Sequence, residues 1–499
     1  MLNDTPEIDN LSNESSYMES EASPSGMTII MWMVFAAILY RLAGILISLA
    51  YFEWSLLAGR VEPLVGLLGD VNARVREYAA GAIWSLARNH AGNKERIVEA
   101  GGIVPLLALL DDVNARVREY AAAIIWSLAR NHAGNKERIA KAGGIVPLLG
   151  LLDDVSTRVR EKAAGALWSL VRNHAGNKER IPEVDGIAPL VGLLGDVNTR
   201  VREKAAGALL SLADHAANRE RIAKAGGIAP LVRLLGDADT QVRSNAAWAL
   251  LNLAANHAAN KKRIGEVGGI ARLVGLLSDV NTGVRENATW ALWSLARNHA
   301  GNKERIPEVD GIAPLVGLLG DVNTRVREKA AGVLGNLAHN HAANKQDIGA
   351  LGAIPELLRL LRDEDDLVRK YAAFALFVMV MDHVANASLL VDSDGITALL
   401  LCRDNQSELV RQYTELNLTI LVADHPDYAE RVGDLKLHLI LALLKDHEFE
   451  ARQCAAYALG KLSQNNAYRE KLQALGAQEK LRPLLEDEDL SARAQARMQ

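Results

Sequence analysis

The sequence has little cysteine, few aromatic residues and no excess of positive charge. Cys402 and Cys454 are the only thiols in 499 residues, too few for a disulfide framework, which fits a reducing compartment. Aromatic residues make up 5% of the chain, whereas Ala and Leu are abundant, a composition that suits closely packed helices. A net charge of −5 provides no global basic field, so we expect no nucleic-acid partner.

One dipeptide, Val-Arg, recurs at a nearly constant interval. Residues 168–207 and 293–332 even share the same forty letters, except that Val171 stands where the second copy has Ala296. The repeated arginines lie 42 or occasionally 41 residues apart, at Arg76, Arg118, Arg160, Arg202, Arg243, Arg285, Arg327, Arg369 and Arg411, and more weakly at Arg452 and Arg493. A fixed period of this length predicts an all-α solenoid of two- or three-helix repeats, which grows by addition beyond a single globular core.

Residues 93–132 illustrate one repeat. We expect Asn93 to cap a short first helix that ends at Gly101 and Gly102, where a positive φ is often needed. Pro105 then fits the first turn of an apolar second helix. Asn114 is expected to cap a third helix. The buried stripe of that helix follows from helical spacing, at Val117, Ala121, Ile124, Ile125 and Leu128.

The pattern "GGIxPLVxLL", then "VRExAAxAL" and a short polar turn with "NK", resembles the armadillo repeat. The resemblance covers residues 59–499, about ten repeats, and weakens after Phe374. It implies a right-handed superhelix whose third helices line a concave groove. Among armadillo proteins the chain resembles vacuolar armadillo proteins and, more weakly, importin-α-type repeats.

Residues that share one face of the third helices form ladders of Glu, Trp and Arg along the expected groove. In importin-α-like repeats, a W-x-x-x-N motif clamps an extended peptide. Here only Trp248 and Asn252 match it fully. Because an extended chain could pair with Asn amides and place Arg or Lys side chains on Trp rings, we predict a peptide site, best equipped from Trp248 to Asn336. Its candidate residues are Trp84, Trp126, Trp168, Trp248, Asn252, Glu286, Trp290, Trp293, Arg297 and Asn336.

The same side chains also allow a purely structural interpretation. Each Trp could pack against the next repeat, and the Glu and Arg ladders could be a solvated face whose pairs contribute about 0.3–0.5 kcal/mol each. Histidine also recurs once in each repeat, from His90 to His425. Ligands of one zinc ion lie about 2 Å from it, so side chains in successive repeats cannot converge on a metal. We expect them to cap or pack the turn after the third helix, where a charged imidazole would suit the helix end.

The N-terminal residues differ from the repeats. Residues 1–26 hold six acidic and no basic residues, a composition that predicts a disordered acidic tail. Residues 27–52 are apolar and long enough to span a bilayer. Arg41 costs about 3 kcal/mol there, against roughly 5 returned by the apolar side chains. We expect a single-pass membrane anchor with the solenoid facing the cytosol; the alternative is a helix that caps the array in a cytoplasmic protein.

These features predict a non-enzymatic scaffold that binds a protein or an extended peptide without a cofactor or metal. No catalytic grouping or nucleotide-binding loop stands out from the repeat pattern. One alternative is a soluble adaptor in nuclear transport or signalling. Another is the substrate-binding arm of a ubiquitin ligase complex, acting through a partner because the array leaves no room for a U-box domain.

Overall fold

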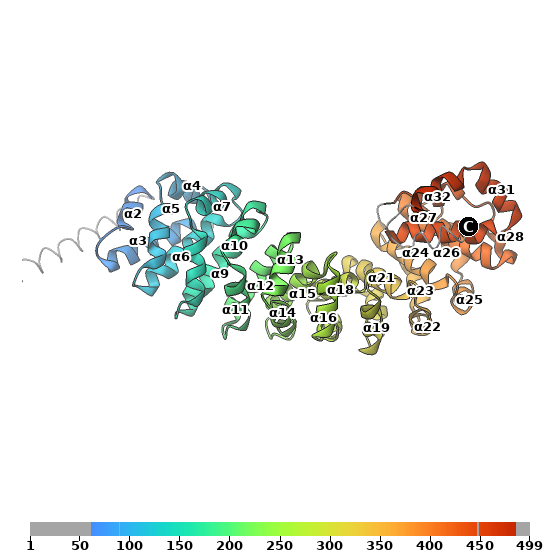
Figure 1. Ribbon diagram of the computed structural model, residues 1–499, viewed down its shortest axis with the longest axis horizontal. Helices are drawn as coiled ribbons and strands as arrows, with labels where there is room; N and C mark the ends of the chain where they lie inside the picture. Colours follow the sequence, from blue (N-terminus) through green and yellow to red (C-terminus); the bar gives the residue numbers. More distant parts are fainter. Residues whose placement is uncertain (1–60, 89, 447–448, 486–499) are drawn as a thin grey trace, which may run out of the picture.

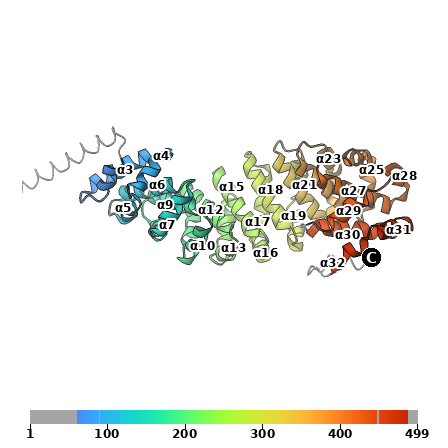
Figure 2. The ribbon, with the colours of Figure 1, turned by 90° about the horizontal axis from the view of Figure 1, so that it is seen from above.

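A computed structural model describes residues 61–88, 90–446 and 449–485. These residues form α-helices and short 3-10 helices without strands, stacked along one long axis (Figures 1 and 2). The predicted all-α solenoid is therefore confirmed. The predicted acidic tail (residues 1–26) and apolar segment (residues 27–52) lie outside the described residues.

Each regular repeat contains three helices. The short first helices are α4 (Ala91–Glu99), α7 (Ala133–Lys141), α10 (Ala175–Glu183), α13 (Ala216–Lys224), α16 (Ala258–Glu266), α19 (Ala300–Glu308), α22 (Ala342–Ala350), α25 (Val384–Asp392) and α31 (Asn466–Ala474). The apolar second helices are α2 (Glu62–Leu67), α5 (Ile103–Ala108), α8 (Ile145–Gly150), α11 (Ile187–Gly192), α14 (Ile228–Leu234), α17 (Gly269–Gly275), α20 (Ile312–Gly317), α23 (Ala353–Leu360), α26 (Gly395–Cys402), α29 (Leu437–Leu443) and α32 (Ala477–Leu485).

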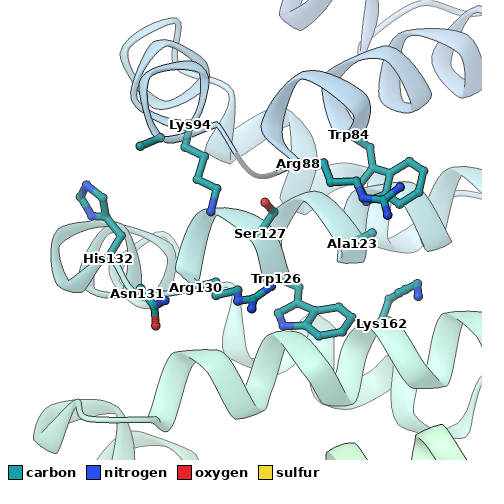
Figure 3. Close-up of a pocket in the computed structure, with 11 residues that line it drawn as sticks. Trp84, Arg88, Lys94, Ala123, Trp126, Ser127, Arg130, Asn131, His132 and Lys162 are labelled. Atoms are coloured by element: carbon teal, nitrogen blue, oxygen red, sulfur yellow. The ribbon is translucent and has the colours of Figure 1, made fainter.

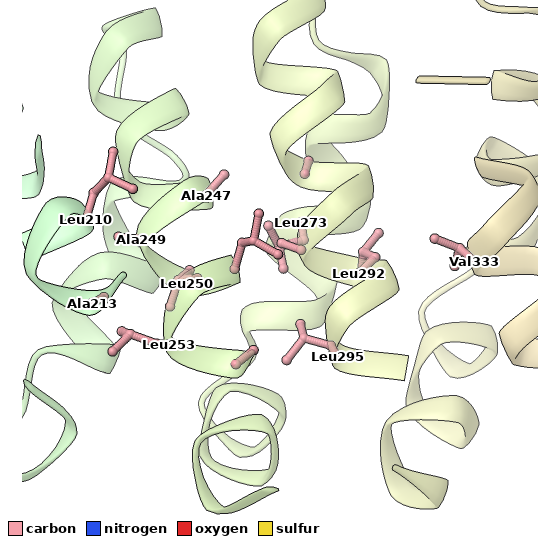
Figure 4. Close-up of a cluster of buried hydrophobic side chains, with 14 of the residues drawn as sticks. Leu210, Ala213, Ala247, Ala249, Leu250, Leu253, Leu273, Leu292, Leu295 and Val333 are labelled. Carbon is pink, nitrogen blue, oxygen red and sulfur yellow. The ribbon is translucent and has the colours of Figure 1, made fainter. Parts of the chain in front are cut away.

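The third helices are the longest and pack against one another in chain order. They are α3 (Ala73–Ala87), α6 (Ala115–Ala129), α9 (Thr157–Val171), α12 (Thr199–Ala213), α15 (Thr240–Ala254), α18 (Thr282–Ala296), α21 (Thr324–Ala338), α24 (Asp366–Val380), α27 (Glu408–Asp424) and α30 (Phe449–Ser463). The predicted stripe on α6 is buried, and the equivalent Leu and Ala side chains of α12, α15 and α18 interdigitate in one continuous core (Figure 4). Small Ala side chains let neighbouring helices approach closely, so each repeat is stabilised mainly by its neighbours.

The predicted start of the third helix is confirmed. Asn114 is the N-cap of α6, and its side chain accepts a hydrogen bond from the backbone N–H of Arg116. The predicted end of the first helix is confirmed as well, because Gly101 has a φ of +74°. In the two copies that read "VDG", Asp185 and Asp310 adopt that left-handed conformation instead.

The predicted cap of the first helix is wrong. The N-cap of α4 is His90, whose Nδ1 accepts a hydrogen bond from the backbone N–H of Asn93. The same bond, 3.1–3.3 Å long, recurs in other repeats, at His132, His174, His257, His299, His341 and His383. These histidines therefore cap the start of the first helix through Nδ1.

The Asn and Lys of the "NK" motif connect the helices through backbone carbonyls. Asn135 Nδ2 donates to the Leu128 carbonyl at the end of α6, 3.2 Å away. Lys261 Nζ donates to the Arg297 carbonyl after α18, at 2.6 Å. Both bonds satisfy carbonyls that a helix end leaves without an intrahelical partner, which explains why this dipeptide recurs.

The repeated arginine joins each repeat to the next. In residues 61–363, seven arginine guanidinium groups each lie 2.6–2.8 Å from an aspartate about 36 residues later. The pairs are Arg76–Asp112, Arg118–Asp154, Arg160–Asp196, Arg202–Asp237, Arg243–Asp279, Arg285–Asp321 and Arg327–Asp363. The aspartate side chains are 4–8% exposed. The Val-Arg spacing is thus the period of a buried ion pair.

The last repeats are less regular, and α27 is followed by a 3-10 turn (Pro426–Tyr428) and the short α28 (Ala429–Val432) in place of a first helix. Across the described ranges, no single helix is both long and apolar enough to cross a bilayer. Only α25 and α26 taken together pass that test, as a pair bent by 78°.

Candidate functional site

A groove runs across the C-terminal halves of α3, α6, α9 and the start of α12. It consists of two cavities of about 760 and 410 Å³, which share Trp126, Arg130 and Asn131. The larger cavity is lined by two of the predicted tryptophans, Trp84 and Trp126, together with several cationic side chains (Figure 3). We refer to these two cavities together as the N-terminal groove.

Each predicted tryptophan of this groove packs on the next repeat and keeps part of its surface open. Trp126 and Trp168 are half-buried against the core. A Cβ added at Gly165 would lie 2.9 Å from the Trp126 ring, and one at Gly207 would lie 2.6 Å from Trp168. Trp84 instead meets Tyr120, with ring centroids 5.8 Å apart. The packing interpretation therefore applies to these side chains, and the peptide site at their open surfaces stays a prediction.

The shifted position of the tryptophans follows from this packing. Positions in each third helix can be counted from the Val of its Val-Arg dipeptide. Where one helix has Trp at the ninth position, as at Trp168, the next helix has Gly or Ala at the sixth, as at Gly207. A Trp at the sixth position, such as Trp248, follows a repeat with Leu210 at the ninth. At these two positions, the ninth of one helix and the sixth of the next, each interface thus has room for one large ring. The departure from W-x-x-x-N reflects which of two helices supplies that ring.

The exposed faces of several tryptophans are covered by cations of the chain itself. Lys204 Nζ lies 5.2 Å from the ring centroids of both Trp126 and Trp168. Arg88 lies 5.5 Å from the Trp84 centroid. Farther along, Lys329 is 4.7 Å from Trp290 and 5.3 Å from Trp293. These are cation–π distances, so the positions expected to hold a ligand's Arg or Lys already hold lysines of α12 and α21.

The central residues predicted for the peptide clamp are not equally accessible. Trp248 is 44% exposed. Asn252 is half-buried, and its Nδ2 donates to the Leu210 carbonyl of α12 at 3.1 Å. Asn336 is 5% exposed. Because an amide must be accessible to pair with a ligand's main chain, Asn252 and Asn336 are less suited to that role than their spacing suggests.

The remaining predicted residues lie around α18. Trp290 and Trp293 are half-buried, and Trp293 contacts Tyr371 edge to face, with ring centroids 6.2 Å apart. Arg297 stacks at 5.5 Å from the Trp293 centroid. Glu286 lies 3.6 Å from the guanidinium of Arg325, an exposed side chain of α21, so this part of the Glu ladder makes inter-repeat pairs.

Sequence reasoning missed the lysines of the N-terminal groove. Lys94, Lys136, Lys162 and Lys204 line its cavities beside the predicted Arg ladder. Burial, together with the charge of Arg130, lowers the pKa of Lys94, and burial with Arg172 and Lys178 lowers that of Lys136. For two of these lysines the sequence does contain a signal. The residue after the repeated Glu is Tyr78 and Tyr120 in the first two repeats but Lys162 and Lys204 in the next two.

No group of three or more His, Cys, Asp or Glu side chains that could hold a metal ion occurs within residues 61–88, 90–446 and 449–485. Both cysteines are buried, and burial raises the pKa of the Cys402 thiol. Neither property favours a reactive thiolate.

A family model for the armadillo/β-catenin-like repeat matches six successive segments, residues 90–130, 132–172, 174–214, 215–255, 257–297 and 299–339. The chain belongs to the armadillo-repeat family. A HEAT-like repeat model also matches residues 324–376. Armadillo solenoids are typically non-enzymatic scaffolds that bind proteins.

One solved structure gives the same picture of the fold. The chain is 28% identical to an engineered protein from the Northeast Structural Genomics Consortium, with a TM-score of 0.73 over 81% of this chain and 98% of that protein. Two designed armadillo repeat proteins match 47% of this chain and 100% and 99% of their own, at 29% and 28% identity and TM-scores of 0.46 and 0.45. The second was solved in complex with the peptide (KR)4. A search of curated proteins gave no match.

Proposed function

We propose that this armadillo protein is a scaffold that binds an extended polypeptide along the N-terminal groove. The observation that carries the proposal is the pair of connected cavities, about 760 and 410 Å³, lined by half-buried tryptophans and long cationic side chains. A groove that crosses successive parallel layers suits a ligand without folded structure of its own, because an extended chain can meet one layer after another.

The test is to fill the groove without removing a contact. Ser169 lies in the smaller cavity, so Ser169→Trp adds a ring there. Val155→Trp adds the same ring to the same repeat, at a loop position that is 93% exposed and lines neither cavity. Unstructured peptides selected from a displayed library on the full-length protein should lose binding to Ser169→Trp by roughly tenfold or more and keep it with Val155→Trp. Equal binding to both variants would contradict the groove as the site.

The central section from Trp248 to Asn336 is a second proposed contact region, favoured by the exposed ring of Trp248. We expect Trp248→Ala combined with Asn252→Ala to weaken binding less than Ser169→Trp, because the Asn252 amide already bonds the Leu210 carbonyl. Binding assays on both variants, with melting temperatures measured in parallel, compare the two sections. A larger loss from the central pair at unchanged melting temperature would place the main contact there.

We also propose that residues 27–52 tether the scaffold to a membrane with the groove on the cytosolic side. The support is their apolar composition and length, with acidic residues before them and the first basic residues within and after them. The protein should stay in the membrane pellet after alkaline carbonate washing, and deletion of residues 27–52 should release it as a folded helical protein. Release of the intact protein by carbonate would favour the soluble adaptor.

A further inference from the structure

The N-terminal groove has a charge opposite to that of the whole protein. Its larger cavity is lined by Arg88, Lys94, Arg130 and Lys162 and by no carboxylate. The smaller cavity adds Lys136, Arg172 and Lys204 and holds one carboxylate, Glu203, whose Oε1 lies 2.6 Å from Lys204 Nζ. The chain as a whole carries −5. The positive charge is therefore concentrated in the groove.

The chain's own cations leave a basic ligand no favourable position on the tryptophans. Lys204 already lies between Trp126 and Trp168, and Arg88 covers Trp84. A ligand's Lys or Arg would have to displace these groups and would approach the remaining cations of the cavities. A carboxylate faces neither obstacle, because it can pair with a cation where it stands.

Three arginines form the accessible row of this surface. Arg88, Arg130 and Arg172 occupy the same position in α3, α6 and α9, immediately after each helix, and all three side chains are exposed. Among the described residues, none of the three has an acidic partner within ion-pair distance. Most nearby carboxylates are taken: Glu77 pairs with Arg116, and Glu161 with Lys162, whereas Glu119 lines neither cavity.

The spacing of Arg88, Arg130 and Arg172 matches the spacing of side chains along a polyproline II chain. Packed helices lie about 8–10 Å apart, so successive arginines repeat at roughly that distance. A polyproline II chain has three residues per turn and rises about 9 Å per turn, which places every third side chain on one face. Acidic residues at three-residue intervals would thus meet one arginine per repeat.

We infer that the N-terminal groove selects an extended acidic segment of a partner protein, with carboxylates at every third residue facing Arg88, Arg130 and Arg172. This inference rests on the proposed function and adds the chemistry of the ligand. A protein segment fits better than a nucleic acid, because the acidic remainder of the chain would repel a long polyanion beyond the groove.

The test uses three fifteen-residue peptides with the repeating units Pro-Ser-Glu, Pro-Ser-Gln and Pro-Ser-Lys, and a peptide of the Glu composition with its glutamates in one block. Fluorescence anisotropy on the full-length protein should show the Pro-Ser-Glu peptide binding tightest. Its binding should weaken as salt rises from about 0.05 to 0.2 M, because screening reduces surface charge pairing. Stronger binding of the Lys peptide, or of a single-stranded RNA of similar charge, would overturn the inference.

Matched variants locate the charge. The triple change Arg88→Gln, Arg130→Gln and Arg172→Gln should weaken the Pro-Ser-Glu peptide by roughly tenfold or more. The control triple Arg74→Gln, Arg158→Gln and Arg200→Gln removes equal charge from exposed positions at the starts of α3, α9 and α12, outside both cavities, and should stay within about twofold. Equal losses in both triples would mean nonspecific attraction and overturn the inference.

The library selection separates this inference from the proposed function. If selected peptides are neutral or basic yet lose binding to Ser169→Trp, the groove binds peptides and the acidic preference is wrong. If no selected peptide depends on Ser169, the proposed function fails as well. A last experiment measures the binding of a synthetic peptide of residues 2–26. If this peptide binds the groove more tightly than every selected peptide, the ligand is the chain's own acidic segment and not a partner protein.

Discussion

The ion pairs of the regular repeats and of the last repeats are built differently. From Arg76 to Asp363 the same Arg–Asp pair recurs at each junction, with Arg side chains 14–18% exposed. After α24 the series stops, because Asn405 stands where the next Asp would be. The last repeats instead contain a pair of another kind, Arg403 with Glu415, whose carboxylate is 0% exposed and also accepts from the backbone N–H of Lys436.

This difference shows two ways of holding a solenoid together. Identical junctions contribute nearly equal increments, so a regular array depends on no single one of them. The junction around α27 is unique and polar: Thr414, Asn417 and Thr419 are fully buried on that helix. Its stability must therefore depend on few groups, and damage there should stay local. The predictions below compare the two regions, beginning with the largest effect.

Glu415→Ala should be the most damaging single change. It leaves the Arg403 guanidinium, 13% exposed, without its carboxylate, and breaking such a buried pair costs about 3–5 kcal/mol. Hydrogen exchange should increase in α27, α29 and α30 while α6–α18 stay protected. Because no tryptophan follows Trp293, tryptophan fluorescence does not report on the last repeats and should change little. Uniform loss of protection along the chain would contradict local stability.

Asp363→Asn tests the regular type of junction and should cost less, about 1.5–3 kcal/mol, the contribution of a hydrogen bond to a charged group. Arg327 donates to this carboxylate at 2.7 and 3.1 Å. Burial opposes ionisation, but Arg327 and the Asp365 N–H outweigh it and lower the Asp363 pKa. A lowered pKa gives stability that is present above the ordinary value and lost as pH falls through the folded one.

Denaturant titrations of wild type and Asp363→Asn at neutral pH and below pH 4 check this sign. The difference between the two proteins should shrink as the pH falls from the ordinary Asp pKa toward the lowered folded one, because the unfolded wild-type chain binds the proton more readily than the folded carboxylate does. A difference that stays constant across this range would mean that the ion pair contributes little and that the side chain acts through its shape.

The fold could be predicted because it depends on periodic features. The Val-Arg spacing, the cap at Asn114 and the diglycine at Gly101 each act within one repeat, so one sequence suffices to recognise them. The cap of the first helix was missed because Asn is the commoner capping residue, whereas His90 fills that place and Asn93 bonds the Leu86 carbonyl. Propensity alone could not separate two polar residues three positions apart.

The site was harder to predict because its chemistry depends on contacts between repeats. Spacing alone selects the tryptophans as candidates, and Trp84, Trp126 and Trp168 line the two cavities. Lys204 lies between Trp126 and Trp168, which precede it in the sequence by 78 and 36 positions. No local sequence pattern indicates contacts between residues so far apart. For the same reason the W-x-x-x-N spacing predicts Asn252 as a ligand clamp without indicating that its amide donates to a carbonyl 42 residues earlier.

Gly207→Ala tests the rule of one ring per interface and should cost about 1–2 kcal/mol. An Ala in a helix normally stabilises by about 0.5–1 kcal/mol relative to Gly, but here its Cβ would lie 2.6 Å from Trp168. Gly192→Ala is the control, because nothing lies within 4 Å of an added Cβ there. Trp168→Leu should rescue Gly207→Ala, because it removes the ring that the added Cβ would meet; failure of that rescue in thermal unfolding would contradict the rule.

The smallest effect should come from the histidine caps, which are a property of the regular repeats. His299 Nδ1 accepts from the Asn302 N–H at 3.2 Å, and burial, with Lys261 nearby, lowers the His299 pKa. Lowered basicity means that the unfolded chain binds the proton more readily, so acidification from pH 7.5 to 5.5 should destabilise the fold. His299→Ala should cost about 0.5–1 kcal/mol at pH 7.5, the usual contribution of a cap.

His299→Asn provides the decisive comparison, because Asn can also cap a helix but does not titrate in this range. Its stability at pH 7.5 should stay close to wild type, and its loss between pH 7.5 and 5.5 should be smaller. In the last repeats His425 makes no such side-chain cap, so His425→Ala should cost less than His299→Ala. If both alanine variants lose equal stability in denaturant titrations, the capping bond is not what these histidines contribute, and packing of the ring must replace it.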